Sequence, residues 1–116
     1  GTFVFPPVAR GAPPRIPSLL APEGFVITAY NPGSVRLEEA ENRRRHDELR
    51  ARLVEGRYTR FDAVGHDGVG TWREPSFAVV GAPVMEVLAL AREFSQNAIY
   101  EWGDGIWRIV TIAPSR

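Results

Sequence analysis

Residues 24–34, GFVITAYNPGS, predict a buried strand that ends in a turn just before a helix. Residues 24–30 are rich in β-branched and aromatic side chains, which are typical of a buried strand. The Asn31-Pro32-Gly33 sequence then has the chemistry of a turn. Ser34 is a residue type that caps helix N-termini, so we expect the helix to begin there.

The helix is expected over residues 34–55, with Gly56 at its end. At 100° per residue, one arc of about 60° contains Val35, Asn42, His46, Leu49 and Leu53. This inward stripe therefore includes an amide and an imidazole. The remaining positions are mostly charged, with Glu and Arg four residues apart, which favours a solvated face of paired charges.

Alternating and apolar segments predict four further strands, over residues 57–64, 75–81, 97–102 and 106–112. A second helix is expected over residues 83–95, because proline suits the first helical position. The resulting order, β-α-β-β-α-β-β, indicates an α+β two-layer sandwich. We expect a mostly antiparallel sheet with both helices on one face, and a ferredoxin-like topology is the nearest named arrangement.

The N-terminal part differs from the rest in composition. Residues 6–22 contain six of the ten prolines, and proline fixes φ and removes a hydrogen-bond donor. We expect residues 1–22 to form a proline-rich strap, with a possible short edge strand at residues 2–5. Residues 23–116 are expected to form a single α+β domain.

Composition excludes several functional classes. The chain has no cysteine, and all fourteen basic residues are arginine, which excludes disulfides, thiolate chemistry and lysine Schiff bases. The formal net charge of zero argues against a dedicated nucleic-acid binder. No apolar run is long enough for a membrane helix, so we expect no membrane association and a cytoplasmic location.

Polar residues gather at the predicted ends of elements and on the inward stripe of the first helix. Converging element ends with partly buried amides are typical of binding sites in small folds. The candidate ligand-binding residues are Tyr30, Asn31, Asn42, His46, Glu74, Gln96 and Asn97.

Two of these residues also suggest acid–base chemistry. His46 is suited to proton transfer near neutral pH, and Glu74 follows Trp72 in sequence, where an indole can raise the pKa of a carboxyl. Each polar residue also has a structural interpretation as a cap or a core hydrogen-bonding group. His66 and Asp67 have no further metal ligand at a suitable spacing, so we expect no metal and no cofactor.

Four short motifs occur in a consistent order: Ile27-Thr28-Ala29-Tyr30-Asn31-Pro32, Glu41-Asn42, Trp72-Arg73-Glu74-Pro75-Ser76 and Phe94-Ser95-Gln96-Asn97-Ala98-Ile99. In these motifs, over about residues 2–112, the chain resembles a bacterial family, the domain of unknown function 3293, with the pattern ITAxNP, EN, WxEPS and FxQNAI. Ser95 stands where the family has glycine. The resemblance implies a small cytoplasmic bacterial domain, and it brings no assigned activity and therefore no catalytic residue.

Three functional hypotheses follow. The first is a non-enzymatic binding module that recognises a small polar ligand or a protein partner, because side-chain amides both donate and accept hydrogen bonds. The second is a small hydrolase or transferase in which His46 and Glu74 act as an acid–base pair. The third is nucleic-acid binding through the residues Arg43, Arg44, Arg45, Arg50, Arg57 and Arg60, interleaved with Tyr58 and Phe61.

Overall fold

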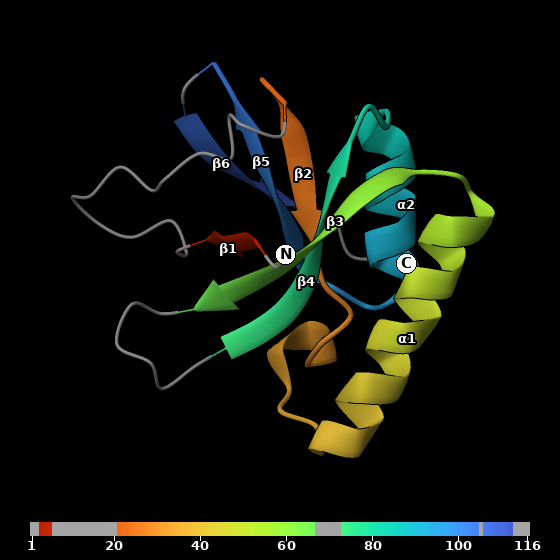
Figure 1. The fold of residues 1–116 in the computed structure, drawn as a ribbon. Coiled ribbons are helices and arrows are strands. Elements are labelled where there is room, and N and C mark those ends of the chain that lie inside the picture. The colour runs from red at the N-terminus through yellow and green to blue at the C-terminus, as the bar shows by residue number, and fades with distance from the viewer. Residues whose placement is uncertain (1–2, 6–20, 67–72, 105, 113–116) are drawn as a thin grey trace.

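A computed structural model describes residues 3–5, 21–66, 73–104 and 106–112. The elements in chain order are β1 (Phe3–Phe5), β2 (Gly24–Ile27), a 3-10 turn (Pro32–Ser34), α1 (Glu39–Glu55), β3 (Thr59–His66), β4 (Arg73–Val80), α2 (Val84–Glu93), β5 (Ala98–Gly103) and β6 (Ile106–Thr111). The strands form one sheet in the order β1-β3-β4-β2-β5-β6 (Figure 1).

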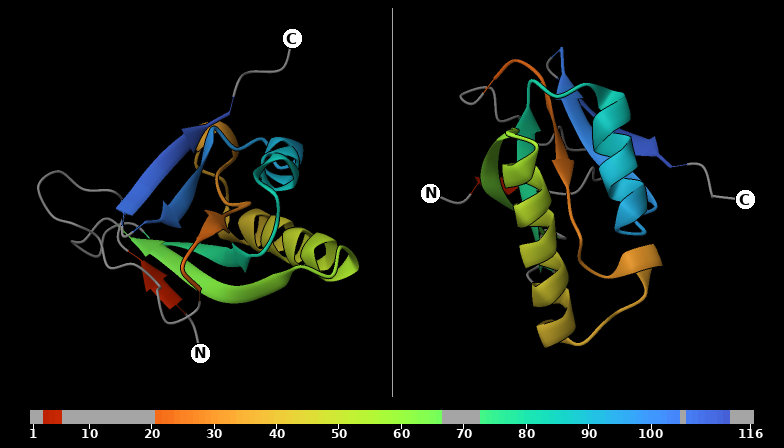
Figure 2. Two further views of the ribbon diagram at one scale, coloured as in Figure 1. Left: turned by 90° about the horizontal axis from the view of Figure 1, so that it is seen from above. Right: turned by 90° about the vertical axis from the view of Figure 1, so that its right-hand side faces the viewer.

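The sheet is antiparallel except at one edge, where β1 pairs with β3 in parallel. Both helices cover the same face of this sheet, as the right-hand view of Figure 2 shows. The expected α+β two-layer architecture is therefore confirmed. The central order β3-β4-β2-β5 is compatible with a ferredoxin-like arrangement of two β-α-β units, extended by β1 and β6.

Apolar side chains pack on both faces of the sheet. The larger cluster lies between the sheet and the helices, and includes Ile27, Leu49, Phe77, Val87 and Ile99 among others. The smaller cluster lies on the other face and consists of Val26, Ala63, Ala78 and Trp102. Alternate residues of one strand enter different clusters, as the two-residue repeat of a strand requires.

The first helix begins later than the sequence predicts. α1 starts at Glu39, so the expectation that Ser34 caps it is wrong. Val35 does not lie on the inward stripe either, since it has an extended backbone and a 62% exposed side chain.

The late start of α1 is explained by a set of tertiary hydrogen bonds around Leu37. Its N–H donates to Asn31 Oδ1 and its carbonyl accepts from Asn42 Nδ2, and these bonds hold the chain out of the helix. The rest of the inward stripe is confirmed, because the buried residues of α1 are Asn42, His46, Leu49 and Leu53.

Strand β2 is shorter than expected and ends at Ile27. Beyond it, side chains replace the strand ladder as hydrogen-bond partners. Thr28 Oγ1 donates to the Pro75 carbonyl at 2.8 Å and accepts the Tyr30 N–H at 3.1 Å. These bonds keep Tyr30 buried at the end of the sheet although it belongs to no strand.

The N-terminal region is described only in part. The expected edge strand is present as β1, whereas most of the proline-rich strap, residues 6–20, lies outside the described residues. On its C-terminal side the Ala21 carbonyl accepts a hydrogen bond from Trp102 Nε1 at 3.0 Å, which ties this segment to the smaller cluster. No helix in the described part of the chain is long and apolar enough to cross a membrane.

Candidate functional site

Asn31 is the centre of the polar cluster. It follows β2 with a left-handed backbone, φ 46° and ψ 64°. Among residues other than glycine, asparagine tolerates this conformation best, because its short side chain can form local hydrogen bonds. The conformation turns the chain from the sheet toward α1, and places both the backbone and the side chain of Asn31 against that helix.

Asn31 and Asn42 bind one another through two hydrogen bonds. The Asn31 backbone N–H donates to Asn42 Oδ1, and Asn42 Nδ2 donates to Asn31 Oδ1, each at 2.8 Å. Asn42 Nδ2 also lies 3.4 Å from the Leu37 carbonyl, and the Leu37 N–H donates to Asn31 Oδ1 at 3.0 Å. The amide of buried Asn42 is thus satisfied within the protein.

The polarity of this network orients the Asn31 amide. Because its Oδ1 receives two donors, its Nδ2 must point away from α1. It points to Glu74 Oε2, at a distance of 3.5 Å. The network therefore presents an N–H group to a carboxyl, with an orientation that is fixed by bonds on its other side.

Glu74 lies at the start of β4, on the face of the sheet that the helices do not cover. Its strand neighbours show this, since Phe77 belongs to the helix-facing cluster and Ala78, which shares the parity of Glu74, belongs to the other one. Burial raises the pKa of Glu74 to about 7, against a smaller opposing effect of the Asn31 hydrogen bond. The pKa of Tyr100 is also raised, first by burial and then by the charge of Glu74.

Gln96 and Arg45 bind backbone carbonyls in two places, in the segment that joins β2 to α1 and at the end of α2. Gln96 Nε2 donates to the Tyr30 carbonyl at 3.0 Å and lies 3.4 Å from the Phe94 carbonyl. Arg45 Nε donates to the Ala29 carbonyl at 3.0 Å, and its Nη2 donates to the Phe94 carbonyl. Both side chains therefore join the end of β2 to the end of α2 and have a structural role.

Tyr30 and His46 lie on the helix-facing side. Tyr30 donates to Glu39 Oε1 at 2.8 Å. His46 stacks on Phe77, with ring centroids 4.5 Å apart, and meets the Tyr30 ring edge-on at 5.9 Å. Burial, followed by the nearby charge of Arg50, lowers the pKa of His46. Its Nδ1 is buried without a hydrogen-bond partner among the described residues.

The seven candidate residues are thus only partly convergent. Asn31, Asn42 and Glu74 form one hydrogen-bonded chain, and Gln96 reaches the backbone of Tyr30 next to it. Asn97 is exposed, and its backbone carbonyl accepts the Ile112 N–H at 2.8 Å. His46 and Glu74 lie on opposite faces of the sheet, so this geometry gives no support to their action as an acid–base pair.

Arg45 is half-buried and bound to backbone carbonyls, contrary to the expectation that it belongs to the solvated face of paired charges. On a helical wheel it lies about 40° from Leu49, at the edge of the buried stripe, and this was the signal that could have found it. Its guanidinium also lies over the Phe94 ring, 5.7 Å from the centroid. An Arg at the edge of an apolar stripe can thus hold carbonyls that lack a strand partner.

The exposed arginines of α1 are largely paired. Arg44 contacts both Glu41 and Glu48, and Arg52 contacts Glu93 at 3.2 Å. Paired guanidinium groups are less available to phosphates, so these contacts weaken the nucleic-acid hypothesis. Within the described residues no group of three or more potential ligands could hold a metal ion, and the side chain of His66, like all of Asp67, lies outside them.

A family model described as a protein of unknown function, DUF3293, matches residues 27–99. The chain belongs to this family. The DUF3293 match begins at the last residue of β2 and ends within β5, so it includes all seven candidate residues. No curated protein and no solved structure matches the chain.

Proposed function

We propose that this DUF3293 domain is a non-enzymatic binding module, and that Glu74 and the Nδ2 group of Asn31 form the recognition centre. The occupant would be a small polar ligand, or a polar group of a protein partner, with N–H or O–H donors for the Glu74 carboxyl. In this proposal the domain works in the bacterial cytoplasm, as the resemblance to its family implies.

The unused hydrogen-bonding capacity of Glu74 is the observation that carries this proposal. A carboxylate can accept about four hydrogen bonds, but among the described residues Glu74 receives one, a long bond from Asn31. Burial disfavours its charged form, which is why its pKa is raised. A ligand that donates to Glu74 would relieve this penalty, and such a ligand would bind more tightly than at a solvated carboxylate.

The other amides support this centre without taking part in it. The donors and acceptors of Asn42 are used within the protein, and the Nε2 group of Gln96 donates to the Tyr30 carbonyl and lies close to the Phe94 carbonyl. Their contribution is rigidity, because a preorganised site loses less entropy when a ligand binds. The proposal therefore predicts that substitution of Asn42 weakens binding indirectly, through the orientation of Asn31.

Thermal shift at pH 8 against amino acids, nucleotides, sugars and amines tests this function. A ligand at a hundred times its dissociation constant adds about 2.7 kcal/mol to stability. The stabilisation should be lost in Glu74→Gln and kept in Glu55→Gln, which removes an exposed carboxylate at the far end of α1. A ligand that stabilises the wild type and Glu74→Gln equally would show that the proposed centre is wrong.

A further inference from the structure

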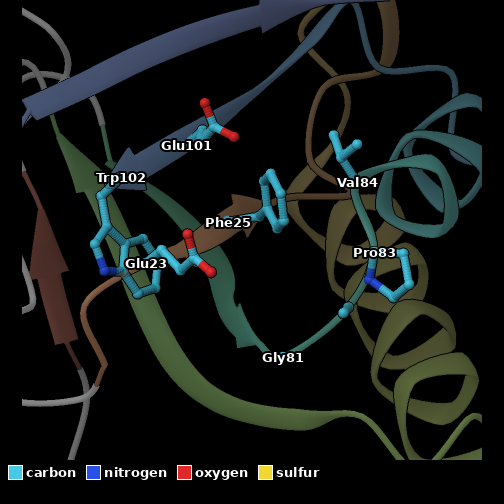
Figure 3. Close-up of a pocket in the computed structure, with 9 residues that line it drawn as sticks. Glu23, Phe25, Gly81, Pro83, Val84, Glu101 and Trp102 are labelled. Atoms are coloured by element: carbon cyan, nitrogen blue, oxygen red, sulfur yellow. The ribbon is translucent and has the colours of Figure 1, made fainter. Parts of the chain in front are cut away.

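A separate cavity of about 460 Å³ lies at the opposite end of β2 from Asn31. It is formed where the β2 start, the β5 end and the N-terminus of α2 meet. Its principal lining residues are Glu23, Phe25, Pro83, Val84, Glu101 and Trp102 (Figure 3). A volume of this size is in the range of small-molecule sites.

The shape of the cavity depends on two backbone features. Gly81 adopts a positive φ of 78°, which turns the chain from β4 to α2 and places Pro83 across from Phe25. Gly24 lies directly under the indole of Trp102, since a Cβ there would be 2.3 Å from the ring. These close contacts make one wall of the cavity apolar and fixed.

Carboxylates give the cavity its charge. Glu101 is the cross-strand neighbour of Phe25, and Glu23 is an exposed residue that has no ion pair within the described part of the chain. In Figure 3 the Phe25 ring is flanked by these two carboxylates on one side and by Pro83 and Val84 on the other. Arg108, which is not one of the lining residues, forms an ion pair with Glu101 at 3.5 Å, so the charge of Glu101 is partly offset while that of Glu23 is not offset by an ion pair within the described part of the chain.

The α2 N-terminus opposes this charge only weakly. A helix N-terminus is equivalent to about half a positive charge, and Glu86 in the first turn of α2 offsets it further. The carboxylate of Glu23, together with the partly offset charge of Glu101, therefore makes the cavity negative. Negative charge beside an aromatic ring favours a cation, because the carboxylates and the ring face both attract it. The apolar wall of the cavity favours a cation that also has an apolar body.

We propose that this cavity binds a small organic cation, in which an ammonium group is attached to an apolar body. The charged group would lie between Glu23 and Glu101, and the apolar body would lie against Phe25, Pro83 and Val84. This site is independent of the recognition centre at Glu74, at the other end of the sheet.

Protein-observed NMR titration of the full chain at low salt tests this site with phenethylammonium, phenethyl alcohol and phenylacetate. Phenethylammonium should shift the amides of residues 23–25, 81–84 and 101 and bind best of the three. Glu23→Gln and Glu101→Gln should each weaken its binding about fivefold, since one nearby charge in water contributes about that factor. Glu55→Gln, with the same change in net charge, should leave its affinity unchanged.

Four results would overturn the proposal. Equal binding of phenethyl alcohol would show that the carboxylates do not select a cation, and preference for phenylacetate would identify the helix N-terminus as the dominant group. Absence of saturable shifts at these residues with up to about 10 mM probe would exclude binding with a dissociation constant in the millimolar range or below. Tighter binding of N-acetylarginine methylamide than of phenethylammonium would identify a partner's side chain, and not a small molecule, as the occupant.

Discussion

Asn31 and Asn42 form a reciprocal pair, in which a backbone N–H donates to one amide oxygen and the other amide donates back, each at 2.8 Å. The pair joins the end of β2 to the buried stripe of α1. It also fixes the direction of the remaining Asn31 N–H group, which points to Glu74. A structural contact in the core thereby determines the geometry of the proposed binding centre.

Replacement of Asn42 tests the importance of this pair for stability. Asn42→Ala leaves the Asn31 N–H and Oδ1 with fewer partners in a buried setting, so the free energy of unfolding should fall by about 2–4 kcal/mol. Asp47→Ala, on the exposed face of the same helix, should cost less than about 1 kcal/mol. Urea denaturation of both variants measures the difference, and equal losses would contradict the role given to the pair.

Glu74 should make stability depend on pH. Its folded-state pKa of about 7 exceeds its ordinary value of 4.5, so its contribution is fully present below pH 4.5 and is lost as the pH rises through 7. The loss amounts to roughly 3 kcal/mol at most. Glu74→Gln cannot ionise and should therefore be more stable than the wild type at pH 8, but similar to it at pH 5. Urea denaturation at the two pH values checks this, and a Glu74→Gln variant that is less stable at pH 8 would count against a buried, destabilised carboxylate.

His46 should make stability depend on pH in the opposite direction. Its folded-state pKa lies below the ordinary 6.5, so its stabilising neutral form is present above pH 6.5, and stability falls as the pH drops below that value. His46→Phe keeps an aromatic ring between Phe77 and Tyr30 and removes the titration. Between pH 7.5 and 5 the free energy of unfolding of the wild type should fall relative to that of the variant, because Glu74 affects both proteins equally. An unchanged difference between the two proteins would assign the acid sensitivity to other groups.

Arg45 and Arg44 are neighbours in sequence with different roles, and they form a matched test. Arg45→Met removes the hydrogen bonds to the Ala29 and Phe94 carbonyls, which should cost about 2 kcal/mol. Arg44→Met removes exposed ion pairs and should cost much less, because exposed ion pairs contribute little to stability. Thermal denaturation ranks the two variants, and a larger loss for Arg44→Met would reverse the assignment.

The sequence predicted the layers of the fold well because they depend on local periodicity. The burial of Asn42, His46, Leu49 and Leu53 follows from helical spacing alone, and the order of helices and strands follows from apolar runs and turn residues. The start of α1 could not be predicted in this way. It depends on Asn31 Oδ1 and Asn42 Nδ2, which reach Leu37 only once β2 and α1 are packed together.

The sequence indicated which polar residues to consider for the candidate site, but not how their side chains are arranged. Sequence clusters located Asn31, Asn42 and Glu74, and the structure joins them by hydrogen bonds. The face of the sheet on which each side chain lies depends on strand register, and this register separates His46 from Glu74. The cavity beside Glu23 was missed because it depends on the turn at Gly81 and on the way in which α2 meets β2.

The ionisation of Glu74 tests the central claim most directly. NMR titration of its side-chain carboxyl carbon in the wild type should give a midpoint near pH 7. The midpoint should rise in Asn31→Gly, because the Asn31 hydrogen bond favours the charged form. A wild-type midpoint near 4.5 would show a solvated carboxylate and would contradict the proposed recognition centre.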